Sequence, residues 1–175
     1  MKIIRKAEFD ISKDQHHQIT ELYNICFSKN LSRSYFKQLP HFRYLVFEQD
    51  LLIAQMGVDY RVIRVGDCVF SIFGVIDLCV EASYRKQGIA SNLLTRLTQL
   101  AQTKSIDFLF CVSHSDSIYL KNGFQAVSQP SSWLGIDEHK NCGVITETIE
   151  ENFMIKQIGE QPWRKGEIDL LGYMF

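Results

Sequence analysis

Residues 81–90 combine the features of an anion-binding helix start. Gly88 and Ala90 remove side-chain bulk at the point where a helical pattern begins, so backbone N–H groups stay open to an anion. Arg85 and Lys86 add positive charge, and the helix dipole favours an exposed anion there by about 0.3–1 kcal/mol. These residue types predict a pyrophosphate site. A helix start whose small residues serve packing is the alternative.

The same segment differs from two common phosphate-binding loops. No Gly-Lys-Ser/Thr follows the glycine, and no G-x-G-x-x-G run occurs in the chain. Both observations argue against an NTPase and against a dinucleotide-binding domain.

Apolar periodicity indicates the elements that must position this segment. Alternating or continuous apolar runs predict strands, whereas apolar residues three and four apart predict helices. The expected strands cover residues 2–9, 44–47, 51–64, 68–80 and 108–112. Helices are expected after Ser12 or Asp14, weakly over 31–40, over 89–104, and from Ser115 or Asp116 to Gly123. This order predicts an α+β or mixed α/β fold with helices on the faces of a largely antiparallel sheet.

Length and composition limit the class of protein. With 175 residues, of which 46% are apolar, the chain has the size of one globular domain over 1–175. The formal net charge of −1 provides no positive field for nucleic acid or for an anionic membrane. Neither is therefore expected as a partner.

Cysteine usage and the N-terminal residues predict a location. The five cysteines form no C-x-x-C pair, and their odd number favours a reducing cytoplasm over a disulfide framework. Glu8 and Asp10 lie where a signal peptide needs an apolar stretch, and no apolar run approaches the roughly 20 residues that span a bilayer. A soluble cytoplasmic protein is expected.

Two separated motifs resemble one known family. The run Arg85-Lys86-Gln87-Gly88-Ile89-Ala90, with the preceding strand from Ile76 to Val80, is similar to the acetyl-CoA motif of the GNAT superfamily of N-acetyltransferases. The run Tyr119-Leu120-Lys121-Asn122-Gly123-Phe124 matches that family's Tyr-x-x-x-Gly-Phe. The resemblance implies a GNAT-like sheet flanked by helices, with a split between its two middle strands that admits acetyl-CoA.

The resemblance also implies roles for individual residues. The backbone of Leu78, Cys79 and Val80 would pair with the pantetheine arm, and one of its N–H groups would polarise the thioester carbonyl. The residues implied to cradle the pyrophosphate are Arg85, Lys86, Gln87, Gly88, Ile89 and Ala90. Tyr119 would protonate the leaving thiolate, because a phenol with a pKa of about 10 keeps its proton at neutral pH. An aromatic side chain that only packs on a short helix is the alternative for Tyr119.

One position departs from the family pattern. Many relatives carry Asn seven residues before the tyrosine, whereas this chain has Val112. One contact to the cofactor that those relatives make is therefore not implied here.

Two side chains are candidates for accepting the proton of an attacking amine. Asp77 lies in the strand beside the implied thioester, where burial would raise its pKa, and a solvent-bridged or ion-paired carboxylate is the alternative. His114 follows the strand over 108–112 and titrates in the right range, although an isolated loop histidine is more often incidental. The other histidines are scattered without ligand spacing, so no metal is expected.

Two further segments resemble particular branches of acyltransferases. Residues 54–66 are similar to NodA-type N-acyltransferases, and the tail from Pro162 to Leu171 is similar to aminoglycoside 2'-N-acetyltransferases. By that analogy Glu167 and the carboxylate of Phe175 would contact the amine substrate. Alternatively, the tail is a closing strand and Trp163 fills the edge of the core. Residues 129–151 are polar and acidic, typical of a solvated face or of a mouth for a cationic substrate.

The sequence thus predicts an acetyl-CoA-dependent N-acetyltransferase that acetylates a primary amine of a small molecule by direct attack. Cys79 and Cys111 are not needed as nucleophiles. Two alternatives stay open: an N-acyltransferase with a longer acyl donor, and a non-catalytic CoA-binding regulatory domain. The charge balance argues against a nucleic-acid or peptide-binding module. The oligomeric state is open, with a homodimer as one option.

Overall fold

The longest strands of the computed structural model are β3 (Leu51–Val65) and β4 (Cys68–Val80), which are neighbours in the sheet. A turn at Gly66 and Asp67 joins them, and Gly66 has a positive φ of 57°. A Cβ atom at Gly66 would lie 2.7 Å from the carbonyl oxygen of Lys165, so this close approach of two chain segments requires glycine.

The structure describes residues 1–113, 116–149 and 153–175, and these form a mixed α/β fold. The chain divides into two units, residues 1–59 with 76–94 and residues 60–75 with 95–175. Strands β3 and β4 are each divided between the two units. Whether residues 1–175 act as one domain stays a prediction.

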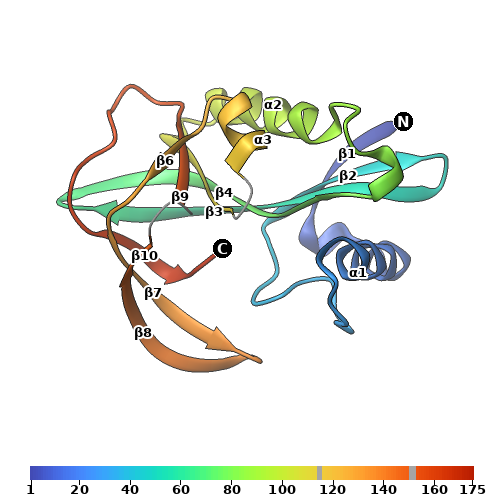
Figure 1. Ribbon diagram of the computed structural model, residues 1–175, viewed down its shortest axis with the longest axis horizontal. Coiled ribbons are helices and arrows are strands. Elements are labelled where there is room, and N and C mark those ends of the chain that lie inside the picture. Colours follow the sequence, from blue (N-terminus) through green and yellow to red (C-terminus); the bar gives the residue numbers. More distant parts are fainter. Residues whose placement is uncertain (114–115, 150–152) are drawn as a thin grey trace. The chain divides into compact units, whose positions relative to one another are not determined.

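The first unit is an antiparallel arrangement of strands with a helix beside it. β1 (Lys2–Ala7) pairs with β2 (Phe42–Glu48), and β2 pairs with the first part of β3. A 3-10 turn, η1 (Glu8–Asp10), leads into α1 (Lys13–Phe27), which lies along one face of these strands (Figure 1). Helix α1 begins at a capping box, in which the Ser12 side chain accepts from the Gln15 N–H and Gln15 Oε1 accepts from the Ser12 N–H.

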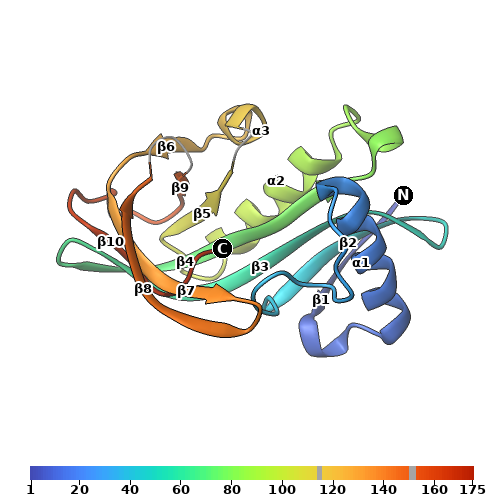
Figure 2. The same ribbon diagram turned by 60° about the horizontal axis from the view of Figure 1, so that its bottom comes forward.

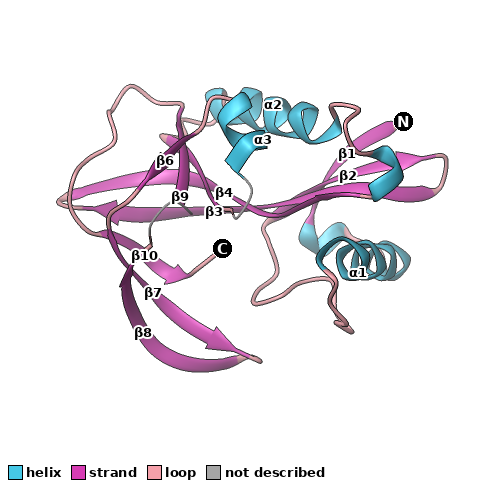
Figure 3. Ribbon diagram, viewed as in Figure 1, coloured by secondary structure: helices cyan, strands magenta, loops and turns pink. Residues whose placement is uncertain are grey.

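The second unit carries the remaining strands. Their bounds are β5 (Phe108–Val112), β6 (Gln125–Val127), β7 (Pro130–Asp137), β8 (Lys140–Thr148), β9 (Phe153–Gln157) and β10 (Ile168–Tyr173). Together with β3 and β4, these strands have the order β6-β9-β5-β4-β3-β10-β7-β8. Strand β5 runs parallel to β4, with Ile72–Val75 opposite Phe108–Cys111. The hairpin of β7 and β8 forms one end of this order, and it is strongly curved (Figures 2 and 3).

Three helical elements follow β4 and β5. The 3-10 turn η2 (Ala82–Tyr84) precedes α2 (Ile89–Gln102), and α3 (Asp116–Lys121) follows β5. Helix α2 buries one apolar stripe formed by Ile89, Leu93, Leu94, Leu97 and Ala101.

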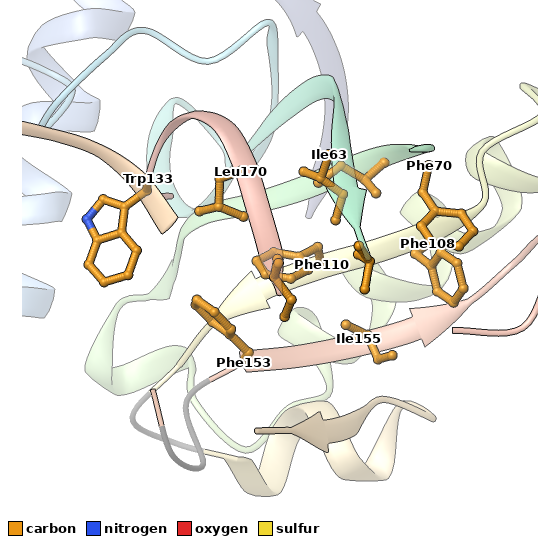
Figure 4. Close-up of a cluster of buried hydrophobic side chains, with 11 residues drawn as sticks. Ile63, Phe70, Phe108, Phe110, Trp133, Phe153, Ile155 and Leu170 are labelled. Carbon is orange, nitrogen blue, oxygen red and sulfur yellow. The ribbon is translucent and has the colours of Figure 1, made fainter. Parts of the chain in front are cut away.

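Aromatic rings form the centre of the core in the second unit. Phe70 and Phe108 meet edge to face with centroids 5.0 Å apart, and Phe110 and Phe153 are 5.2 Å apart (Figure 4). Trp163 packs on the same cluster, stacked with Phe70 at 6.0 Å, and its indole N–H donates to Gln129 Oε1. Trp163 therefore fills the edge of the core, and the closing strand expected after it is β10.

Most expected elements are confirmed, and three segments differ. Residues 8–10 form a 3-10 turn rather than the end of a strand, and residues 129–151 include the hairpin strands β7 and β8. The weak helix expected over 31–40 is wrong. There the Asn24 side chain bonds both polar backbone groups of Leu31 at 2.9 Å, and Arg43 Nη2 donates to Ser34 O, so side chains replace the hydrogen bonds that a helix would supply.

None of the described helices is long and apolar enough to cross a membrane.

Neighbouring residues of β4 should differ sharply in their contribution to stability. Phe70 is fully buried, whereas the adjacent Val69 is 58% exposed. We expect Phe70→Ala to lower the free energy of unfolding by about 3–5 kcal/mol, because it removes a ring from a packed core. Val69→Ala, the control, should change it by less than about 0.5 kcal/mol. Equal effects in urea unfolding would contradict the assigned burial.

Candidate active site

The start of α2 has the geometry expected of an anion cradle. Gly88 has φ 79°, and its carbonyl accepts the helical N–H of Asn92 at 2.9 Å, so Gly88 is the residue from which the helix begins. Apart from its two neighbours in the chain, none of the described residues lies within 4 Å of the position that a Cβ would take at Gly88. N–H groups in the first turn of a helix have no acceptor within the helix, and this opening gives a ligand access to them.

The loop before α2 is tied back to the end of β4. Arg85 Nε donates to the carbonyl of Val80 at 3.0 Å, and the Glu81 N–H donates to Ile53 O at 2.8 Å. Lys86 has a positive φ of 62°, and residues 85–88 are all exposed. The exposed Arg85 and Lys86 thus place positive charge beside the opening at Gly88, as expected for diphosphate binding.

Strand β4 changes direction at Asp77. Asp77 has φ 51°, a left-handed conformation that few residues other than glycine adopt, and its carbonyl accepts a hydrogen bond from Gln55 Nε2 at 2.7 Å. Among the described residues, the ladder between β4 and β5 covers Ile72–Val75 and ends before this point. The residues after Asp77, which are Leu78, Cys79 and Val80, therefore lie beyond that ladder.

The carboxyl group of Asp77 is held in an environment that favours its protonated form. Burial raises the pKa of Asp77 to about 6, although the positive charges of Arg43 and Lys37 oppose the shift. The same burial effect raises the pKa of Tyr23 to about 12, and the charge of Asp77 adds to it. With this pKa the Asp77 carboxyl is still ionised at pH 7, and it takes up a proton as the pH falls through about 6.

Two thiols lie next to the end of β4. Cys26 Sγ on α1 donates to Val80 O at 3.5 Å, and Cys26 and Cys79 hydrogen-bond to each other. The bond from Cys79 lowers the pKa of Cys26 to about 7, helped by Arg85 and opposed by burial. The bond with Cys26, and then burial, raise the pKa of Cys79. Cys26 is thus the more acidic thiol of the pair.

Tyr119 lies in the second unit, on α3, and is 7% exposed. Its ring meets Phe124 edge to face at 5.3 Å. Burial, and then the neighbouring Cys111 thiol, raise the pKa of Tyr119, so the phenol keeps its proton at neutral pH. The Tyr119 ring thus packs in the core, and its hydroxyl is protonated at neutral pH.

The remaining predicted site residues differ in what surrounds them. His114 lies outside the described residues, and Glu167 is exposed, with its backbone carbonyl accepting from the Gly66 N–H. The ring of Phe175 packs over the guanidinium of Arg61 at 4.0 Å and against Gly74, where a Cβ would lie 2.0 Å from it. Val112 packs on the aromatic core, which explains an apolar residue there.

Sequence reasoning missed the polar residues that support β4 from within the first unit. Gln55 and Arg43 are fully buried. Gln55 donates a hydrogen bond to Asp77 O, and Arg43 donates one to the Gln55 side chain. Gln55 interrupts an apolar run in β3, and an isolated amide in a buried strand is a usable signal, because it needs hydrogen-bond partners. Arg43 gives no such signal, since a single arginine near a strand start is usually exposed.

No group of three or more His, Cys, Asp or Glu side chains within residues 1–113, 116–149 and 153–175 is arranged to hold a metal ion.

Comparisons with known proteins agree with this geometry. A family model described as an acetyltransferase (GNAT) domain matches residues 10–127. A search of curated protein sequences finds no match.

Several solved structures share the fold at low sequence identity. YhbS, a GNAT family N-acetyltransferase of Escherichia coli in complex with CoA, has a TM-score of 0.63 and 12% identity over 97% of this chain and 90% of that chain. A GNAT family acetyltransferase of Brucella melitensis in complex with acetyl-CoA has a TM-score of 0.60 and 10% identity over 95% and 94%. Eis1 of Mycobacterium abscessus has a TM-score of 0.61 and 14% identity over 75% of this chain and 34% of that chain, so this chain spans about one third of its length.

The predicted family and the mixed α/β GNAT fold are confirmed, and CoA or acetyl-CoA is bound in two of these structures. The likeness of residues 54–66 and 162–171 to particular acyltransferase branches stays a prediction. Since the family model covers well over half of the residues, the chain belongs to the GNAT acetyltransferase family.

Proposed function

We propose that this chain is an N-acetyltransferase that moves the acetyl group of acetyl-CoA to a primary amine of a small molecule by direct attack in a ternary complex. The observation that carries the proposal is the helix start at Gly88, which combines an open left-handed glycine with the exposed charges of Arg85 and Lys86. Family membership adds the class of reaction.

In this proposal the chain's residues bind, orient and move protons. Bound acetyl-CoA supplies an activated acyl carbon. The segment 85–90 binds the diphosphate, and the backbone of Leu78, Cys79 and Val80 orients the pantetheine arm and polarises the thioester carbonyl. Cys79 and Cys111 take no covalent part.

Two side chains are assigned to proton transfer. The Asp77 carboxylate accepts a proton from the amine, and the Tyr119 phenol donates one to the departing sulfur. The protonation states support these roles, since Asp77 is ionised and Tyr119 is protonated at pH 7, while burial makes the Tyr119 phenol a weaker acid than a free tyrosine. Glu167 and the Phe175 carboxylate are proposed to attract the cationic acceptor. The cytoplasm is the proposed location.

The cradle is tested by placing a negative charge in it. Gly88→Glu should weaken acetyl-CoA binding at least tenfold, because a carboxylate repels the diphosphate and a left-handed non-glycine residue is strained by about 1–2 kcal/mol. Gly143→Glu is a matched control, since Gly143 also has a positive φ of 84° and open space around it. Isothermal titration that finds Gly88→Glu equal to the parent would refute the site.

The acid is tested by removing one oxygen atom. Tyr119→Phe preserves the ring contact with Phe124, so the fold should persist while kcat falls on the order of 10²-fold and acetyl-CoA affinity stays constant. Tyr60→Phe, at a tyrosine that is 52% exposed, is the control and should retain full turnover. Unchanged kcat in Tyr119→Phe removes that residue from the mechanism.

The base is tested by the pH dependence of kcat/KM. Because the carboxylate must be ionised to accept a proton, activity should fall as the pH drops through about 6, the pKa of Asp77. The groups that face Asp77 are Arg43, Lys37, Tyr23 and Cys79. Asp77→Asn should abolish this limb and most of the activity, whereas Asp67→Asn, in the β3–β4 turn, should do neither. A limb that persists in Asp77→Asn assigns the base elsewhere.

The same assays separate the two alternatives. Preference for long-chain acyl donors over acetyl-CoA indicates the longer-donor enzyme. Tight acetyl-CoA binding without acetylation of polyamines, aminoglycosides, amino acids or peptides indicates the non-catalytic CoA-binding domain.

A further inference from the structure

A buried arginine in the first unit is linked to the main chain of β4 through one amide side chain. Arg43 on β2 is fully buried, and its guanidinium pairs with Glu8 through Nε at 2.8 Å and Nη2 at 3.0 Å. Nη2 also donates to Ser34 O at 2.8 Å, and Nη1 donates to Gln55 Oε1 at 2.9 Å. Gln55 Nε2 completes the link by donating to Asp77 O at 2.7 Å.

The chemistry of its two partners fixes the orientation of the Gln55 amide. A guanidinium only donates hydrogen bonds, so it must face the amide oxygen of Gln55. A main-chain carbonyl only accepts, so the amide nitrogen must face Asp77 O. Arg43 therefore determines which end of Gln55 meets β4, and the two residues act as a unit.

The contact falls at the point where β4 departs from regular strand geometry. Asp77 has φ 51°, a conformation that must be held by its surroundings. The hydrogen bond from Gln55 Nε2 to Asp77 O, at 2.7 Å, lies directly before Leu78 and Cys79 in the strand. The direction of the Asp77 carboxyl and of the backbone at Leu78 and Cys79 thus depends on Gln55.

A purely structural role would not need this arrangement. Burying a charged pair such as Arg43 and Glu8 costs desolvation free energy that well-packed apolar side chains avoid, so the network is a poor device for stability alone. What the network supplies is a single orientation of the groups around it.

We propose that Gln55 and Arg43 are positioning residues for acetyl transfer: Arg43 orients the Gln55 amide, and this amide holds β4 in its left-handed turn at Asp77. This turn orients the Asp77 carboxylate and the Leu78–Cys79 backbone toward the acetyl-transfer reaction. This inference rests on the proposed function of the same site. It extends that proposal to residues that touch neither the diphosphate nor the reacting atoms.

The test compares two glutamine-to-methionine substitutions in the first unit. Gln55→Met keeps the side-chain length and removes the bonds to Arg43 and Asp77 O. Gln18→Met is the matched control, because Gln18 Oε1 accepts from the Leu52 N–H of β3 at 3.0 Å and so bonds to a strand other than β4. We expect Gln55→Met to lower kcat about 10- to 100-fold with a much smaller loss of CoA affinity, and Gln18→Met to change neither.

A second variant guards against a loss of folding. Gln55→Glu retains an acceptor for Arg43 but has no N–H for Asp77 O, and it should also lose kcat. A well-folded Gln55→Met with parental kcat overturns the proposal. So does a fall in kcat that only follows the folded fraction and appears equally in Gln18→Met, because this result indicates a structural role.

A binding readout separates this inference from the proposed function. In amide NMR spectra, CoA should shift the signals of Leu78, Cys79, Val80 and Gly88 in the parent protein. In Gln55→Met the Gly88 response should persist while the response at residues 78–80 is lost. An identical response in both proteins overturns the positioning role, even if no acceptor amine is ever acetylated.

Discussion

The buried charge of Arg43 is the constraint on which the first unit depends. An arginine without solvent contact needs acceptors for the N–H groups of its guanidinium. Here η1, the 31–40 segment and β3 supply these acceptors. These elements are distant in sequence, so satisfying one side chain brings them to defined positions. The left-handed turn at Asp77 is the last link of this set, through Gln55.

In the proposed function, two different structural features of the candidate site bind two parts of acetyl-CoA. Gly88 has no side chain, so the start of helix α2 beside Arg85 and Lys86 is open. At residues 77–80 the feature is a part of β4 that extends beyond its ladder with β5, so among the described residues its edge on that side is not paired with β5. The solved relatives retain the fold at 10–14% identity.

The parts of the structure that depend on local signals could be predicted from the sequence. The helix start at Gly88, a helix cap at Ser12 or Asp14 and the long strands before Val80 follow from small residues, capping residues and periodicity; the structure places the cap at Ser12. The hairpin of β7 and β8 was missed because its exposed strand is polar along most of its length, so alternation is weak. The Arg43–Gln55–Asp77 link was missed because it joins three strands whose register no local pattern records. The non-helical path of residues 31–40 depends likewise on distant side chains.

The carbonyl oxygen of Val80 receives two donors, the Arg85 guanidinium and the Cys26 thiol. A thiol that has been alkylated or oxidised has no proton to give, and Arg85 then becomes the sole donor of this pair. The acidity of Cys26 makes such modification easy, since thiolates are the reactive form. Oxidation of Cys26 would therefore remove one of the two donors that hold Val80 O beside the loop carrying Arg85 and Lys86, and a reducing agent belongs in any buffer used to study the protein.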